Sequence, residues 1–254
     1  MRRALAAGLA PVLALVLVSG AAAITNGAPD GNDHPEVGAL LAPEAYSDGT
    51  WAACTGTLVS PTVFLTAAHC DLGEARVAVT FDAAYHAATG TTHWGTWHAN
   101  VGYSQKQNDP GDIAVVVFDE PVPGIEPARL PAAGALGGLR VGTGFTSVGY
   151  GAQSVTIDHG PVFHYADVRY AATGGLFAVN KAWLRISMNP ALGDGGTCYG
   201  DSGGPNFLGA GSSETDIVAG LTVTGDILCK ATNVVYRTDT PAARTFLEAY
   251  VDLP

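Results

Sequence analysis

The sequence is poor in the residues and patterns that mark several classes of protein. Only 14% of its 254 residues are charged, and 23 acidic residues outnumber 12 basic ones. No basic patch stands out, which argues against a nucleic acid or an anionic membrane as a partner. The C-x-x-C spacing of zinc sites and the N-x-S/T signal for glycosylation are both absent. We therefore expect no metal, no cofactor and no nucleic-acid partner.

Long hydrophobic runs are absent after the first 23 residues. At the start of the chain, two arginines precede an apolar stretch from Ala4 to Val18, and Ala21–Ala23 offers an A-x-A cleavage site. This layout is typical of a secretory signal peptide. A membrane anchor is the alternative, but Pro11 interrupts the stretch, which is shorter than the ~20 residues of a span. Cleavage before Ile24 predicts a secreted chain whose formal charge changes from −11 to −13.

Cysteine is scarce, and the four residues present are even in number. In an exported chain an even number of cysteines predicts disulfides. Four cysteines permit three pairings, and their spacing alone does not choose among them.

Glycine is abundant by contrast, with 33 residues, and short β-type runs recur between turn-forming residues. This pattern is typical of antiparallel sandwiches or barrels. A segment rich in Pro and Gly, residues 123–138, indicates either a linker between two halves or one long loop within a single barrel. Thr240 and Pro241 predict a terminal helix that docks on the second half. The expected strands are residues 57–59, 63–66, 77–81, 113–118, 145–148, 183–187, 217–223 and 234–237.

The segment TCYGDSGGP, residues 197–205, sets one serine among several glycines and beside an acid. A surface turn is its plain interpretation. A serine hydroxyl becomes a nucleophile, however, when a base takes its proton and an acid orients that base. His69 ends a strand-like run beside Cys70, and Asp112 opens the apolar run DIAVVVF. Each residue alone also fits a structural role, so the case rests on their combination.

Three segments in this order, TAAHC, GDIAVVVFDEPV and GDSGGP, resemble the signatures of the trypsin/chymotrypsin family of serine proteases. CTGTLVSPTVFLTAAHC, VGYG and NVVYRTD resemble further family segments. The resemblance covers residues 24–254 and implies an all-β fold of two six-stranded antiparallel barrels with a C-terminal helix. It places the first barrel at about 24–122, the linker at 123–138, and the second barrel with the helix at 139–254. It also implies a secreted, monomeric endopeptidase that cleaves polypeptides without a cofactor.

The resemblance gives each site residue a role. Ser202 attacks the scissile carbonyl, His69 takes its proton and later protonates the leaving amine, and Asp112 orients the imidazole. The backbone N–H groups of Gly200 and Ser202 form the oxyanion hole. The implied disulfides are Cys54 with Cys70 and Cys198 with Cys229.

The resemblance also implies an activation pair, in which the new ammonium group of Ile24 binds Asp201. Because Ile24 directly follows the predicted signal peptide, we expect export alone to activate the enzyme, without a second cut. An α-amino group titrates near ~8, so activity should fade at alkaline pH.

Substrate preference depends on the pocket for P1, the residue before the scissile bond. Gly196 stands where trypsin-like members carry the aspartate that pairs with Lys or Arg. Thr224 and Val234 align with glycines of wide-pocket relatives, so we expect a narrow slot that favours small apolar P1 residues. Asp226, with Asp194, keeps a basic P1 residue open as the alternative. The implied substrate-binding residues are Gly196, Tyr199, Thr222, Val223, Thr224 and Val234, with the Thr222 hydroxyl bonded to Asp112.

Other interpretations fit less well. GDSGG also matches the G-x-S-x-G elbow of α/β-hydrolases, but their catalytic histidine follows the serine and the last histidine here is His164. A subtilisin-like order would need an aspartate before His69, and nothing favours Asp30, Asp33 or Asp48. The run THWGTWH lacks a third metal ligand and is interpreted as a loop. A catalytically silent homologue that acts as a binding module is the rival from another class, although all three triad residues are present.

Overall fold

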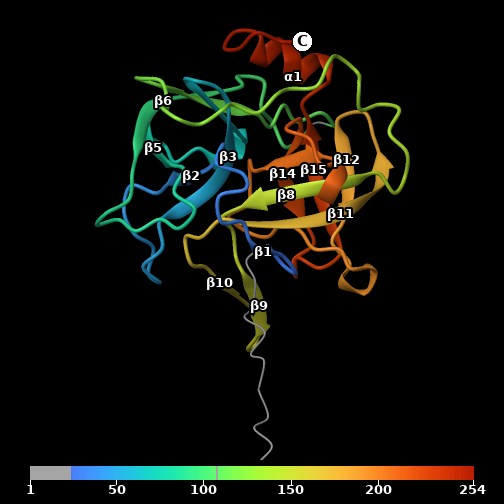
Figure 1. Cartoon of the computed structure of the whole chain (residues 1–254), viewed down its shortest axis with the longest axis horizontal. Coiled ribbons are helices and arrows are strands. Elements are labelled where there is room, and N and C mark those ends of the chain that lie inside the picture. The colour runs from blue at the N-terminus through green and yellow to red at the C-terminus, as the bar shows by residue number, and fades with distance from the viewer. Residues whose placement is uncertain (1–23, 107) are drawn as a thin grey trace, which may run out of the picture.

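The computed structural model describes residues 24–106 and 108–254, so the predicted signal peptide lies outside the described residues. Two closed antiparallel barrels of six strands each stand side by side (Figure 1). The first barrel has the strand order β2-β3-β4-β7-β6-β5. Its strands are β2 (Val37–Leu41), β3 (Ala52–Ser60), β4 (Val63–Thr66), β5 (Arg76–Thr80), β6 (His93–Ala99) and β7 (Ala114–Phe118).

The second barrel has the order β11-β12-β15-β14-β13-β8 and closes through pairing of β11 with β8. Its strands are β8 (Gly144–Gly149), β11 (Tyr170–Val179), β12 (Trp183–Ser187), β13 (Pro205–Leu208), β14 (Val218–Gly225) and β15 (Thr232–Arg237). A two-residue strand from the start of the chain, β1 (Ala28–Pro29), adds to the outer side of β11. A hairpin of β9 (Ser154–Ile157) and β10 (Pro161–His164) projects from this half (Figure 1).

All eight strands expected from the sequence are present, two of them with the expected bounds. The segment 123–138 lies between β7 and β8 and joins the two barrels. Each barrel surrounds its own apolar core, with Phe64 and Val116 in the first and Phe145 and Leu184 in the second. A further apolar cluster contains residues of both barrels and packs between them. The site described below lies where these ends meet.

The predicted helix is α1 (Pro241–Leu247), and the Thr240 side chain caps it by accepting a hydrogen bond from the N–H of Ala243 at 3.2 Å. Beyond the helix, the Tyr250 ring lies 5.4 Å from that of His98 in β6, centroid to centroid. The C-terminal segment therefore reaches the first barrel as well, and not the second half alone as expected. Among the described residues, no helix has the length and apolar character needed to cross a membrane.

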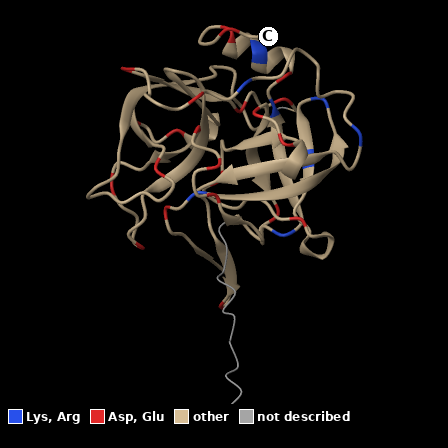
Figure 2. Ribbon diagram, in the orientation of Figure 1, with Lys and Arg blue, Asp and Glu red and all other residues tan. Residues whose placement is uncertain are grey.

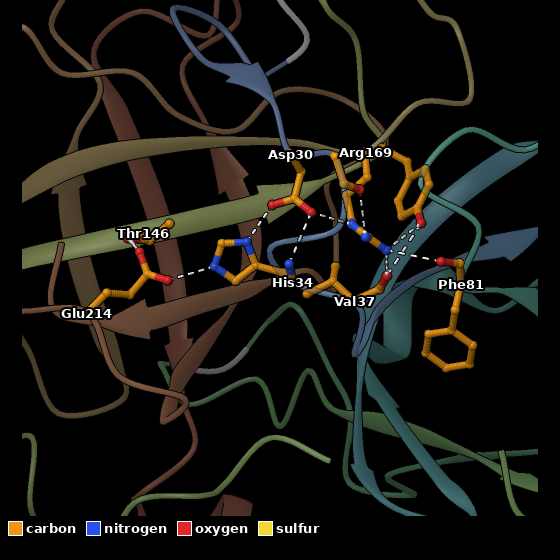
Figure 3. A network of polar contacts seen from close by, with 9 residues as sticks. Asp30, His34, Val37, Phe81, Thr146, Arg169 and Glu214 are labelled. Atoms are coloured by element: carbon orange, nitrogen blue, oxygen red, sulfur yellow. Dashed lines mark hydrogen bonds and ion pairs between the residues drawn. The ribbon is translucent and has the colours of Figure 1, made fainter. Parts of the chain in front are cut away.

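Buried charges fasten the segment after β1 to both barrels (Figure 3). The fully buried Arg169 donates from Nε to Asp30 at 2.7 Å and from Nη1 to the carbonyl oxygen of Val37 at 2.9 Å. His34 bonds to Asp30 through Nδ1 and to Glu214 through Nε2. Burial alone would lower the pKa of His34, but its hydrogen bonds to the two carboxylates raise it to about 9. His34 is therefore a protonated link between the two halves at neutral pH.

Charge is unevenly divided between the barrels. Acidic residues lie on loops of both barrels, whereas the basic residues in this view lie mainly on the second barrel and α1 (Figure 2).

Candidate active site

His69 and Asp112 meet because their strands are neighbours. His69 lies in a 3₁₀ turn (Ala68–Cys70) just after β4, and Asp112 lies just before β7. Thr66 pairs with Ala114 in the antiparallel β4–β7 ladder, so the end of one strand adjoins the start of the other. Asp112 Oδ2 lies 2.8 Å from His69 Nδ1, and Oδ1 accepts the backbone N–H of His69 at 2.9 Å.

Both oxygens of the Asp112 carboxylate therefore interact with His69. Asp112 is 1% exposed, so water does not compete for these bonds. A carboxylate at Nδ1 favours the tautomer with its proton there, which leaves Nε2 as a base. The geometry holds the imidazole in one orientation and one tautomer.

Ser202 lies in the turn before β13, and both barrels hold that turn. The N–H of Thr55 in β3 donates to the Ser202 carbonyl at 2.9 Å, and the N–H of Gly203 donates to the Thr222 carbonyl in β14 at 2.8 Å. Ser202 and His69 line one cavity of about 280 Å³. Their side chains make no hydrogen bond to each other among the described residues, as is common at such sites without substrate.

Two backbone N–H groups beside Ser202 are unused. Within residues 24–106 and 108–254, neither Gly200 nor Ser202 donates its N–H to an acceptor. Gly200 has φ +95°, and a Cβ there would lie 2.8 Å from the Cα of Gly151. Both conformation and space therefore require glycine, and the turn offers two donors to an incoming oxygen.

Asp201, between those two residues, is completely buried. Its oxygens accept the backbone N–H groups of Gly151 and Cys198, each at 2.8 Å. Burial raises the pKa of Asp201 to about 7, although both hydrogen bonds act to lower it. No cationic side chain pairs with this carboxylate in the part of the chain that the structure describes.

Ile24 is also completely buried, at the start of the described chain. Its neighbour Thr25 pairs with Gly196 and accepts the N–H of Gly196 at 2.9 Å. The start of the described chain therefore lies against the segment that leads into Asp201.

The two disulfides implied by the sequence resemblance are both present. Cys54–Cys70 ties β3 to the turn that carries His69, and Cys198–Cys229 ties the turn of Ser202 to the loop between β14 and β15. Each bond therefore braces one side of the cavity.

Four of the six predicted substrate-binding residues line the cavity and two do not. Gly196 and Val234 are not among its lining residues, and neither is Asp194. Val234 instead pairs with Thr224 across the β14–β15 ladder. The lining residues are His69, Thr197, Cys198, Tyr199, Ser202, Thr222, Val223, Thr224, Gly225, Asp226 and Cys229.

The Asp226 carboxylate is occupied by its own loop. It accepts the backbone N–H groups of Lys230, Ala231 and Thr232, with the shortest bond 2.7 Å long. Burial opposes ionisation, but these bonds prevail and lower the pKa of Asp226. It serves as a loop cap at the rim of the cavity.

Sequence reasoning missed a polar group behind the site. The Thr222 hydroxyl, expected to bond to Asp112, instead accepts from Nδ2 of the fully buried Asn206 at 3.1 Å. Asn206 Oδ1 accepts from Ser147 at 2.6 Å and from Asn233 at 2.8 Å. One amide thus joins β8, β13, β14 and β15 behind the nucleophile turn. No signal in the sequence pointed to this contact, because no strand was predicted at residues 205–208, where β13 lies.

Comparisons with known proteins show the family and the fold. The profile of the family described as Trypsin matches residues 39–246. The solved structure of human heparin binding protein is similar in fold, with a TM-score of 0.66 and 16% sequence identity. The match covers 88% of this chain and 96% of that one.

Proposed function

The chain belongs to the trypsin family, and we propose that it is a secreted serine endopeptidase that acts through Ser202, His69 and Asp112. One observation carries this proposal: a buried carboxylate commits both oxygens to an imidazole that shares a cavity with a serine. The unused N–H groups beside that serine support the same chemistry.

In the proposed reaction, His69 Nε2 takes the Ser202 proton as Oγ attacks the substrate carbonyl. The imidazolium that forms is stabilised by Asp112, which keeps its own charge. The carbonyl oxygen becomes an oxyanion that the N–H groups of Gly200 and Ser202 receive. His69 then protonates the leaving amine, and water repeats the sequence to hydrolyse the acyl-enzyme.

We further propose that the ammonium group of Ile24 pairs with Asp201 after the signal peptide is removed. The buried carboxylate lacks a cation, and an unpaired buried charge is costly. A new ammonium group beside it would relieve that cost and fix the turn that carries Gly200. Secreted protein whose first residue is not Ile24 would contradict this proposal.

For substrate preference we propose small apolar P1 residues. Thr224 lines the cavity where a wide pocket would have glycine, and the loop-capping role of Asp226 leaves little capacity for a basic P1 side chain. A preference for Lys or Arg remains the alternative because Asp226 still lies at the rim. Cleavage of a peptide library, read at P1, separates the two.

A binding module is the second candidate function, since a protein of similar fold is named for binding heparin. The charge of this chain argues against that particular ligand. Its 23 acidic residues outnumber its 12 basic ones, so it carries a net negative charge and would repel a polyanion. The retained triad geometry favours catalysis.

Covalent labelling tests the proposal directly. In processed protein, Ser202 Oγ should displace fluoride from a sulfonyl fluoride, with the hydroxyl proton leaving as HF. Mass spectrometry should then find one sulfonyl group on Ser202. Ser202→Ala should stay unlabelled, and so should protein unfolded before treatment. If correctly processed, folded protein is not labelled and cleaves no peptide, the binding module is the better description.

A further inference from the structure

One buried side chain lies under the cavity and belongs to no role described so far. Met188 directly follows β12 and is 1% exposed. Its N–H donates to the carbonyl of Ala231 at 3.0 Å, next to β15, so its backbone is fixed. Its thioether reaches toward residues of the cavity wall.

Three neighbouring positions locate this thioether, which is itself not among the lining residues of the cavity. The Thr197 hydroxyl points at Met188 Sδ from 3.9 Å. A Cβ built on Gly196 would lie 2.4 Å from Met188 Cγ and 2.6 Å from Sδ. A Cβ on Gly225 would lie 3.7 Å from Met188 Cε. Thr197 and Gly225 both line the cavity, so the thioether fills the space directly beneath them.

From this geometry we infer that Met188 determines P1 specificity by forming the closed end of the pocket. This inference rests on the proposed protease function and adds the residue that sets pocket depth. A thioether is uncharged and only a weak hydrogen-bond acceptor, so it cannot form an ion pair with an ammonium or guanidinium group. The closed end therefore accepts a methyl or isopropyl group and stops longer side chains.

The same contact explains the glycine at position 196. Any side chain there collides with Met188 Cγ and Sδ, so a carboxylate cannot stand at the bottom of this pocket while Met188 fills it. Depth and charge selectivity are thus set together by one pair, Met188 and Gly196.

The test uses matched peptides that differ only at P1, with Ala, Val, Leu or Phe. Wild-type enzyme should prefer Ala or Val over Leu and Phe. In Met188→Ala, the ratio of kcat/KM for P1 Leu to that for P1 Ala should rise about 10-fold or more, since each methylene in an apolar pocket is worth roughly 10- to 200-fold. This ratio does not depend on the fraction of enzyme that is folded.

Controls separate a pocket effect from general damage. Ile186→Ala removes an equally buried side chain on β12 that packs in the apolar core of the second barrel, so its ratio should match wild type. If Met188→Ala fails to fold, Met188→Val still removes Sδ and Cε and should raise the ratio in the same direction. A wild-type preference for Phe, or an unchanged ratio in an active variant, overturns the inference.

A double substitution gives an independent outcome. Gly196→Asp alone should lower activity on every peptide, whereas Gly196→Asp with Met188→Ala should raise the P1 Lys to P1 Ala ratio. If Gly196→Asp alone gains Lys cleavage equally well, Met188 does not fill the pocket end. Sulfonyl fluoride labelling of each variant reports on the proposed function separately. If the wild-type enzyme is not labelled, the protease assignment itself is wrong.

Discussion

His34 Nε2 lies 2.6 Å from Glu214 Oε1, although 180 residues separate them in the chain. The imidazole also stacks on Phe207, with ring centroids 5.3 Å apart. It therefore links the segment after β1 to the second barrel by charge and by packing.

This link should weaken at alkaline pH. Because the pKa of His34 is raised from 6.5 to about 9, its stabilisation is complete below pH 6.5 and is lost as pH rises through about 9. A shift of this size corresponds to roughly 3 kcal/mol.

Urea unfolding at pH 6.5 and pH 9.5, in a Ser202→Ala background, should show a smaller loss of stability in His34→Gln than in the parent. His159, whose side chain is 99% exposed, supplies the control: His159→Gln should behave like the parent, and equal losses in all three proteins would contradict the prediction.

Asp112→Asn should leave the fold intact and remove most of the activity. Asparagine can accept one hydrogen bond from His69, but its amide favours the wrong tautomer of the imidazole. In the known triad of this family the loss is about 10⁴ in kcat, and we expect a similar loss here with KM little changed. Steady-state kinetics at pH 8 and a melting curve decide the matter. A loss confined to KM would mean that Asp112 positions substrate.

Asp201→Asn should separate activity from stability. The folded-state pKa of Asp201 is raised from 3.8 to about 7, so the parent loses stability as pH rises from about 4 to 7. In the uncleaved chain the variant should lack this loss and be more stable at pH 8. In the processed chain, where we propose that the Ile24 ammonium pairs with the carboxylate, the variant should be less stable and inactive. Denaturant midpoints of the four proteins give the comparison, and the same sign in both forms would rule out the ion pair.

Asn206→Leu should destabilise the protein by at least about 3 kcal/mol. The substitution keeps the branched outline of the side chain but leaves the Ser147 hydroxyl, the Asn233 amide and the Thr222 hydroxyl without a partner in a buried site, and each unpaired group costs about 1–3 kcal/mol. Ser147→Ala removes a single bond and should cost about 1 kcal/mol. Thermal or urea unfolding measures both. A neutral Asn206→Leu would show that the amide contributes nothing beyond its shape.

Local pattern was sufficient for the strands with continuous apolar or β-branched runs. β4 and β12 were predicted with their full bounds, and Thr240 was identified as a cap. β11 was missed because Gly174 and Gly175 interrupt it, although they lie where the barrel closes on β8. The run THWGTWH was interpreted as a loop but forms β6. His93 and His98 stand five positions apart on this strand, so they point to opposite faces and cannot share a metal ion.

The site divides in a similar way. Motif order was enough to name His69, Asp112 and Ser202, because chemistry restricts those residue types. The partner of Thr222 was not predictable, since Asn206 meets it only through the register of β13 on β14. Met188 was missed for a related reason: a lone methionine gives no signal until folding brings Gly196 and Gly225 over it.

The short strand β1 pairs with Tyr170 and Ala171, and Asp30 forms an ion pair with Arg169. Because the chain is synthesised from its N-terminus, this segment emerges before its partners. Its packing therefore cannot be completed until more than half of the 254 residues have been made.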